Sequence, residues 1–254
     1  MVQTPRPVPL LEPGKPPIAL LVDFDGTIAR GDVTAAVMRA NLPAGGGLPW
    51  DEVSRSTWPD MMREAASLFP TDPSRLLEAA AAVPLDTTFT PLAALARDGG
   101  VAMEVVSDGL GFFIGPALRR LDAAWVPIAS GDTRFGPERT RVAFPFGNPA
   151  CGVCGTCKRN RVLAHQAAGR RVAFVGDGES DRYAAGYADV VFAKDGLVEI
   201  CREGGLVYRP WTSFDDVTAW LEEQLAAFSA APASLPGPVV RPLFCGAEVW
   251  GPGR

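Results

Sequence analysis

Four short, continuous apolar runs constrain the fold more than any other feature of the chain. They cover residues 18–22, 101–106, 171–175 and 190–193, and Trp125–Ala129 is a weaker fifth candidate. Runs without polar alternation are typical of strands buried on both faces of a parallel sheet. Helix-like segments separate the runs, as the crossovers of a parallel sheet require. The sequence predicts an α/β fold with a Rossmann-like parallel sheet; its expected helices include 91–97, 112–121 and 214–228.

The core of this fold is expected to comprise residues 18–31 and 84–229, interrupted by two insertions. The first, residues 32–83, has apolar residues at helical spacing and predicts an inserted helical cap domain. We expect the cap surface around Trp50, Trp58 and Met61 to face the functional site. The second insert, residues 130–160, is rich in Gly and Pro, and its stretch Thr140–Phe146 is expected to form a short hairpin.

Both ends of the chain are expected to lie outside the core. Residues 1–17 contain six prolines, which predicts a flexible, solvated arm, and residues 230–254 read as a Pro- and Gly-rich tail. The N-terminus has no apolar core of signal-peptide length, and no apolar run approaches the 18 to 20 residues of a membrane span. We therefore expect a cytoplasmic protein with no membrane partner. No pattern in the sequence specifies an oligomeric state.

Charge and histidine content exclude several functions. Lys and Arg total 24 against 29 Asp and Glu, which gives a net charge of -5. A chain without an excess of basic residues is not expected to bind nucleic acid. His165 is the only histidine, which excludes a mechanism that needs two. It follows Lys158 by seven residues on an expected helix, and we interpret it as a helix-surface or core histidine rather than a ligand.

Acidic residues follow two of the predicted strands directly. Asp23 and Asp25 stand in the segment Asp-Phe-Asp-Gly-Thr after the first run, and Asp177 and Asp181 stand in Gly-Asp-Gly-Glu-Ser-Asp after residues 171–175. The carboxyl ends of parallel strands form the ligand-binding edge of an open α/β sheet. Four carboxylates gathered there need a cation, and a hard, oxygen-seeking ion such as Mg²⁺ suits them. The sequence therefore predicts a magnesium site.

Two further elements suit the binding of an anion. Ser107-Asp108-Gly109 follows the second run, and its hydroxyl and backbone amides are expected to hold an anion ahead of the next helix. Lys158 supplies a cation. A phosphate dianion and an attacking carboxylate repel each other by about 8 kcal/mol at 4 Å and an effective dielectric constant of 20. A metal, a lysine and backbone donors would offset that repulsion.

Together these residues resemble the four ordered motifs of the haloacid dehalogenase superfamily, over residues 18 to 195. The resemblance implies a nucleophile at Asp23, a general acid and base at Asp25, and a phosphoryl group bound by Ser107 and Lys158. It also implies Mg²⁺ held by Asp23, the backbone carbonyl of Asp25 and Asp177, with Asp181 supporting its water shell. Dehalogenases of the family lack the second acid, so Asp25 favours a phosphatase acting through an aspartyl-phosphate.

Within the superfamily the chain is most similar to the methionine-salvage branch. The likeness rests on residues 106–109, on Cys154-Gly155-Thr156-Cys157-Lys158, and on Phe192-Ala193-Lys194-Asp195 leading to Cys201. It implies a small phosphorylated metabolite as substrate, 2-hydroxy-3-keto-5-methylthiopentenyl 1-phosphate among the possibilities. The alternatives are a phosphotransferase or phosphomutase on the same scaffold, a phosphoserine-type phosphatase, and a non-catalytic binding module.

Three cysteines crowd into the second insert at two-residue spacings. Cys151, Cys154 and Cys157 offer three soft ligands, whereas a closed zinc site needs four. Cys201, Cys245 or His165 could complete such a site. Structural zinc, a labile disulfide, and free thiols that pack the loop before Lys158 all remain open interpretations.

Overall fold

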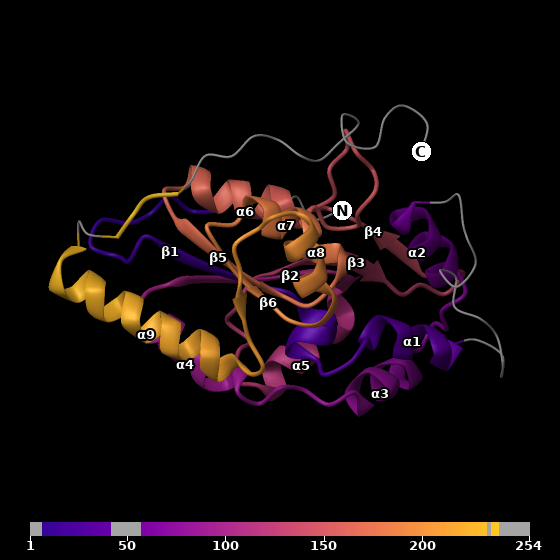
Figure 1. Cartoon of the computed structure of the whole chain (residues 1–254). Coiled ribbons are helices and arrows are strands. Elements are labelled where there is room, and N and C mark those ends of the chain that lie inside the picture. The colour runs from indigo at the N-terminus through magenta and orange to yellow at the C-terminus, as the bar shows by residue number, and fades with distance from the viewer. Residues whose placement is uncertain (1–6, 42–56, 233–234, 239–254) are drawn as a thin grey trace.

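A single sheet organises the computed structural model, which describes residues 7–41, 57–232 and 235–238 (Figure 1). The strand order is β4-β3-β2-β1-β5-β6-β7, and all neighbours are parallel except β3 and β4. This confirms the predicted α/β fold with a parallel sheet. The strands are β1 (Ile18–Val22), β2 (Ala102–Leu110), β3 (Ile128–Arg134), β4 (Arg141–Ala143), β5 (Arg171–Gly176), β6 (Val190–Ala193) and β7 (Arg209–Pro210).

Helices cover both faces of the sheet. Successive residues of a strand point to opposite faces, so Leu20 packs on one side of β1 and Leu21 on the other. The Leu20 face is covered by α4 (Phe89–Asp98), α5 (Gly111–Arg120) and α9 (Phe214–Ala230), and the Leu21 face by α6 (Lys158–Ala167), α7 (Arg182–Tyr187) and α8 (Asp195–Glu203) (Figure 1). The continuous apolar runs are explained by this double burial.

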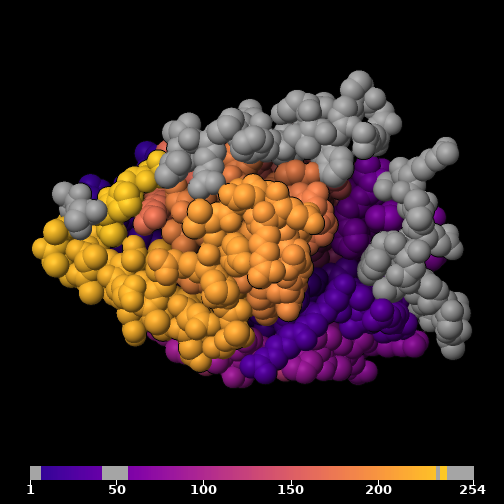
Figure 2. Space-filling view, in the orientation of Figure 1, coloured from indigo at the N-terminus to yellow at the C-terminus, as the bar shows by residue number. Residues whose placement is uncertain are grey.

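Ahead of α4, the described part of the segment between β1 and β2 contributes three α-helices, which pack against the core at different places. It contains α1 (Val33–Asn41), α2 (Trp58–Ser67) and α3 (Ser74–Ala82), and α1 packs on α3 (Figure 1). In Figure 2 the indigo surface of the α1 region borders the orange surface of the C-terminal part of the core. The helical character expected for residues 32–83 is present in the described part, whereas Trp50 lies outside the described residues.

Three local expectations differ from the structure. β3 begins at Ile128 rather than Trp125, and the hairpin pairs β4 with the end of β3 instead of closing within Thr140–Phe146. The Ser107–Gly109 segment lies inside β2 rather than in a loop, because a register shift against β3 lets the strand continue to Leu110. Helix α5 then starts at the next residue.

Part of the N-terminal segment is bound to the core. The Leu11 amide donates to the Ala168 carbonyl at 2.9 Å, and the Arg170 guanidinium donates to the carbonyls of Pro9 and Leu10 at 2.6 and 3.2 Å. These contacts attach the segment to the core, while the side chains of Pro9 and Leu10 stay exposed. Within the described residues, none of the helices has the length and apolar character needed to span a bilayer.

Candidate active site

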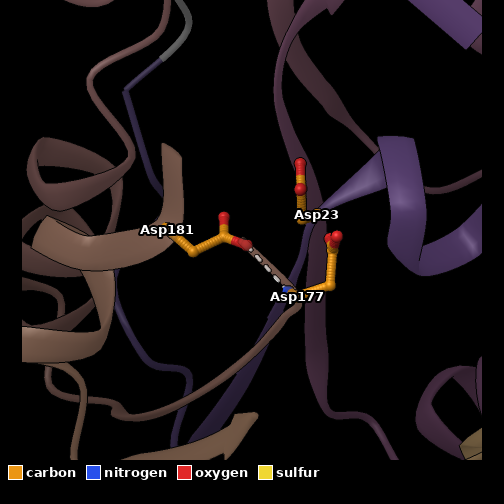
Figure 3. Close-up of side chains that lie close together, drawn as sticks. All are labelled: Asp23, Asp177 and Asp181. Atoms are coloured by element: carbon orange, nitrogen blue, oxygen red, sulfur yellow. Dashed lines mark hydrogen bonds between the residues drawn. The ribbon is translucent and has the colours of Figure 1, made fainter. Parts of the chain in front are cut away.

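Three aspartates meet at the carboxyl edge of the two central strands. Asp23 follows β1, and Asp177 follows the neighbouring β5; the Asp23 amide donates to the Val175 carbonyl at 3.0 Å. One carboxylate oxygen from each of Asp23, Asp177 and Asp181 lies within 4.8 Å of the other two (Figure 3). Sequence-distant motifs thus converge because parallel strands end at one edge of a sheet.

Gly26 permits the close approach of the two loops. Its φ of 74° is in the left-handed region, and a Cβ at this position would overlap the Asp177 carboxylate. Only glycine satisfies both conditions without strain. The next residue, Thr27, donates its hydroxyl to Asp177 Oδ1 at 2.8 Å and so fixes that carboxylate. The segment Asp-Phe-Asp-Gly-Thr therefore shapes the site as well as supplying its acids.

Lys158 is buried among these carboxylates. Its Nζ lies 2.7 Å from Asp23 Oδ1 and 2.7 Å from Asp181 Oδ1, and it donates to Ser180 Oγ at 2.9 Å. Lys158 is the first residue of α6, so the helix start carries the cation into the site. Burial by itself lowers the pKa of the ammonium, but the Asp181 and Asp23 carboxylates raise that pKa above its ordinary value overall. The lysine therefore stays charged.

Asp181 holds the loop rather than facing open space. Its side chain is fully buried; Oδ1 contacts Lys158, and Oδ2 accepts the amides of Asp177 at 2.9 Å and Gly178 at 3.2 Å. Figure 3 shows the bond to the Asp177 amide. With both oxygens engaged, Asp181 orients Lys158 and Asp177, while Asp23 and Asp177 carry the carboxylates that remain for a ligand.

Asp25 accepts two hydrogen bonds from the start of α1. The Val33 amide donates to Oδ1 at 2.9 Å, and the Thr34 hydroxyl donates to Oδ2 at 2.7 Å. Burial, assisted by the Asp32 carboxylate, raises the pKa of Asp25 to about 7, against the lowering effect of both donors. Near neutral pH this carboxyl group exists in both protonation states, as a general acid and base requires.

The charge balance of the cluster fits a divalent metal ion. Burial first, and the Asp181 carboxylate second, raise the pKa of Asp23 well above its ordinary value. Burial raises the pKa of Asp177 to about 6, against the hydrogen bond from Thr27. Carboxylates that are this costly to ionise are stabilised by a nearby cation, and their oxygens are the ligands of hard ions. Asp23 and Asp177 therefore form a suitable ligand pair.

The Ser107–Gly109 segment lines the same pocket, but its three residues differ in orientation. The Ser107 Oγ accepts the Gly109 amide at 2.9 Å, which leaves the hydroxyl hydrogen able to donate to an anion. The Asp108 carboxylate instead accepts the Thr156 amide at 2.7 Å, ahead of α6. Asp108 thus joins β2 through its carboxylate to the loop that leads to Lys158, while the contact of its backbone with phosphate stays a prediction.

A pocket of about 360 Å³ opens over this cluster. Cap residue Trp58 borders it and donates its indole Nε1–H to the Asp108 carbonyl at 3.1 Å, whereas Met61 is not among the described lining residues. Three lining residues with polar side chains were not predicted as site residues: Asp32, Thr34 and Ser180, of which Ser180 lies within the Gly-Asp-Gly-Glu-Ser-Asp motif. The lining residues are Asp23, Asp25, Gly26, Asp32, Thr34, Trp58, Ser107, Asp108, Gly109, Lys158, Asp177, Gly178 and Ser180.

The cysteines lie beside this pocket and not in it. Cys151, Cys154 and Cys157 border a separate, smaller cavity next to Lys158 and Ser180. Among the described residues, the aspartate cluster is the one group of three or more Asp, Glu, Cys or His side chains that converges closely enough to share an ion. Burial raises the pKa of the Cys157 thiol, which disfavours the thiolate that binds zinc. The described cysteines thus offer zinc no converged ligand set.

Comparisons with known proteins agree with this geometry. Residues 20–186 match the family model of the haloacid dehalogenase-like hydrolases. A 2-hydroxy-3-keto-5-methylthiopentenyl-1-phosphate phosphatase from Exiguobacterium sibiricum is 29% identical over 214 residues, which cover 81% of this chain and 96% of the relative. The enzyme of the same name from Geobacillus thermodenitrificans is 30% identical, over 82% of this chain and 97% of the relative.

Solved structures share the fold. A substrate-bound phosphoserine phosphatase superposes with a TM-score of 0.60 at 13% identity, over 82% of this chain and 99% of the other. Cytosolic 5'-nucleotidase IIIB bound to cytidine gives a TM-score of 0.57 at 14% identity, over 86% of this chain and 88% of the other. Because the family model matches residues 20–186 and the relatives are phosphatases, the chain belongs to the haloacid dehalogenase-like hydrolases and is a phosphoric monoester hydrolase.

Proposed function

We propose that this enzyme is a cytoplasmic, Mg²⁺-dependent phosphatase that hydrolyses a small phosphorylated metabolite through an aspartyl-phosphate on Asp23. The observation that carries the proposal is the contact of Lys158 Nζ with Asp23 Oδ1 at 2.7 Å, beside Asp177 and under an open pocket. It combines a nucleophile, a fixed cation and a suitable pair of metal ligands at one point. When bound, Mg²⁺ supplies positive charge that offsets the repulsion between substrate and nucleophile.

The proposed first step forms the Asp23–phosphorus bond and breaks the bond between phosphorus and the ester oxygen. Asp25 donates its proton to that departing oxygen. In the second step a water molecule attacks the aspartyl-phosphate, Asp25 takes the proton of the water, and inorganic phosphate leaves. The raised pKa of Asp25, about 7, supports both roles at neutral pH.

The remaining residues of the pocket would hold the phosphoryl group and the ion. Ser107 would donate its hydroxyl to a phosphoryl oxygen, and Lys158 would balance its charge. Asp23, Asp177 and the backbone carbonyl of Asp25 would hold Mg²⁺, with Asp181 keeping the loop in place. The side-chain oxygens of Asp25 are engaged by α1, which supports a contribution to the metal through its backbone alone.

For the substrate we propose 2-hydroxy-3-keto-5-methylthiopentenyl 1-phosphate, whose chain beyond the phosphate carries no charge. The named activity of relatives that cover most of this chain supports this choice. So does the described pocket lining, in which Lys158 is the one cation and is already paired with carboxylates. The amino-acid carboxylate of phosphoserine would lie there without a cation and near the acidic Asp32, which costs free energy.

The test is phosphate release from this substrate, from phosphoserine and from p-nitrophenyl phosphate, each with Mg²⁺ and with EDTA. We expect release that requires Mg²⁺, and a preference for the methylthiopentenyl phosphate, whose chain beyond the phosphate is uncharged, over phosphoserine. Asp23→Asn should abolish both turnover and the acid-stable trapping of phosphate on the protein without loss of fold. The matched control is Asp72→Asn, an exposed aspartate outside the pocket lining. Full activity of Asp23→Asn would refute the mechanism, and a preference for phosphoserine would refute the substrate.

A further inference from the structure

A cluster of buried polar side chains, which includes an ion pair of Glu104 and Arg161, lies outside the pocket. Glu104 on β2 accepts two hydrogen bonds from Arg161, Nε to Oε2 at 3.1 Å and Nη2 to Oε1 at 2.9 Å. His165 Nε2 lies 3.1 Å from the same Oε2. The side chains of Glu104, Arg161 and His165 are 5%, 12% and 6% exposed. Such a cluster is costly to bury and none of its members lines the active-site pocket, so its role is not explained by the phosphatase chemistry.

The hydrogen bonds of the cluster converge on the Glu104 carboxylate. Arg161 donates to it twice, and His165 Nε2 lies within hydrogen-bond distance of it. The paired contacts with Arg161 have the fork geometry that makes a guanidinium–carboxylate pair both strong and directional. Glu104 is therefore the shared acceptor of the cluster. Its removal would leave the Arg161 charge buried without its partner.

The cluster joins the two elements that carry Ser107 and Lys158. On α6, Lys158 is followed by Arg161 three residues later and His165 seven residues later, so the three lie along one face of the helix. On β2, Glu104 stands three residues before Ser107. The pair of Glu104 and Arg161 thus fixes the first turn of α6, which begins with Lys158, to the strand that presents Ser107.

Three further contacts support the same junction. The Arg161 guanidinium stacks on the Phe146 ring, 5.3 Å from its centroid, and the Phe146 carbonyl accepts the Cys157 amide at 2.9 Å. Asp108, four residues beyond Glu104 on β2, accepts the Thr156 amide at 2.7 Å. Two carboxylates of β2 therefore hold the start of α6: Asp108 binds the chain just before Lys158, and Glu104 binds it just after. A shift of this helix start would move Lys158 Nζ away from Asp23.

We propose that Glu104 is a positioning residue of the phosphatase, which acts through Arg161 to hold Lys158 in register with Asp23 and Ser107. The inference rests on the proposed function, because Lys158 is the group whose position it controls. Loss of the Glu104 contact would let the first turn of α6 move. The bound phosphoryl group would then lose part of its interaction with the Lys158 charge, while the pocket and the nucleophile would stay intact.

The test uses Glu104→Gln, which keeps the shape of the side chain and removes its charge. A displacement of about 1 Å in a catalytic group can cost up to about 100-fold in rate, so we expect kcat/KM for p-nitrophenyl phosphate to fall about 30-fold. The inhibition constant for inorganic phosphate should rise about tenfold, because Lys158 binds the phosphoryl group. In a Lys158→Ala background the same substitution should lower kcat/KM by less than about twofold, because the effects of coupled residues do not add.

Gln166→Leu is the matched control on the same helix. Gln166 Nε2 donates to the Tyr187 carbonyl at 2.9 Å and to Asp189 Oδ2 at 3.0 Å, so it holds the other end of α6 to another part of the core. We expect it to lower Tm and to leave the inhibition constant for phosphate unchanged. If Glu104→Gln does not fold, the double variant Glu104→Gln/Arg161→Gln, which leaves no unpaired charge, is assayed in the same way.

Hydrogen exchange separates failure of this inference from failure of the proposed function. Glu104→Gln should speed exchange of the amides of residues 158–162, whereas Gln166→Leu should not. If the wild-type enzyme releases no phosphate, the proposed function fails. If exchange at these amides is unchanged in Glu104→Gln, Glu104 does not anchor the first turn of α6, whatever the activity. With an active enzyme, an equal loss of kcat/KM in the wild-type and Lys158→Ala backgrounds would assign Glu104 a general structural role and overturn the proposal.

Discussion

Asp25→Asn should change the way in which the stability of the protein depends on pH. The substitution preserves the size of the side chain, and an asparagine can still accept from the Val33 amide, while the Thr34 hydroxyl can turn from donor to acceptor. What the variant removes is the ionisable proton. Because burial raises the pKa of Asp25 in the folded protein, ionising this group opposes folding.

The expected size follows from the pKa values. The pKa of Asp25 rises from its ordinary value of 3.8 to about 7 in the folded state. The stabilising effect of its protonation is complete below pH 3.8 and is lost as the pH rises through about 7. At 1.36 kcal/mol per pH unit, the contribution of Asp25 to the free energy of unfolding falls by about 2 kcal/mol between pH 5 and 7. The fall over the whole pH range is about 4 kcal/mol.

Urea unfolding in EDTA at pH 5, 6, 7 and 8 measures this effect. The free energy of unfolding of Asp25→Asn, relative to wild type, should increase with pH by about 2 kcal/mol between pH 5 and 7. Asp72→Asn is the control. Hydrogen bonds from Ser74 lower the pKa of the exposed Asp72, so its contribution is already complete at pH 5 and the difference from wild type should be flat. A flat difference for Asp25→Asn as well would refute the reasoning.

Three other substitutions test separate parts of the site. Lys158→Ala should lower kcat/KM by about 100-fold or more, because its charge balances the phosphoryl group; an unchanged rate in a phosphate-release assay would remove it from the site. Gly26→Ala should lower the free energy of unfolding in a urea titration by about 2 kcal/mol, because Gly26 has a positive φ and an added Cβ would overlap Asp177. Gly178→Ala is the control: its Cβ would meet no other atom, so the free energy of unfolding should change little. Trp58→Phe loses the donor to the Asp108 carbonyl and should raise KM about fivefold with kcat nearly constant; equal KM values would show that this bond does not close the pocket.

The strand pattern was sufficient to predict the central strands of the sheet. Residues 18–22 and 190–193 are strands with the predicted bounds, because a strand buried on both faces must be apolar at every position. β3 was harder, since its segment Ile128–Arg134 contains Ser, Gly, Asp and Thr. Its place in the sheet comes from pairing with β2 and β4, which a local pattern cannot show.

The acids of the site were also predictable, because they follow buried strands whose ends must meet at one edge. The separate role of each carboxylate was not predictable. Both oxygens of Asp181 are occupied by Lys158 and two backbone amides, and the Asp108 carboxylate accepts the Thr156 amide. Nothing in the motifs themselves distinguishes these two aspartates from the neighbouring ones. Hydrogen-bond direction depends on which donors the folded chain brings within reach.

The sequence by itself determined the central parallel strands, the family and the acids at the sheet edge, because burial periodicity and motif spacing are local properties of the chain. Only the tertiary structure decided the contacts between segments far apart in the sequence. Thr27 donates to Asp177 across 150 positions of the chain, and Arg161 donates to Glu104 across 57. Such pairs leave no spacing signal, because their distance is set by how helices pack on the sheet and not by the backbone between them.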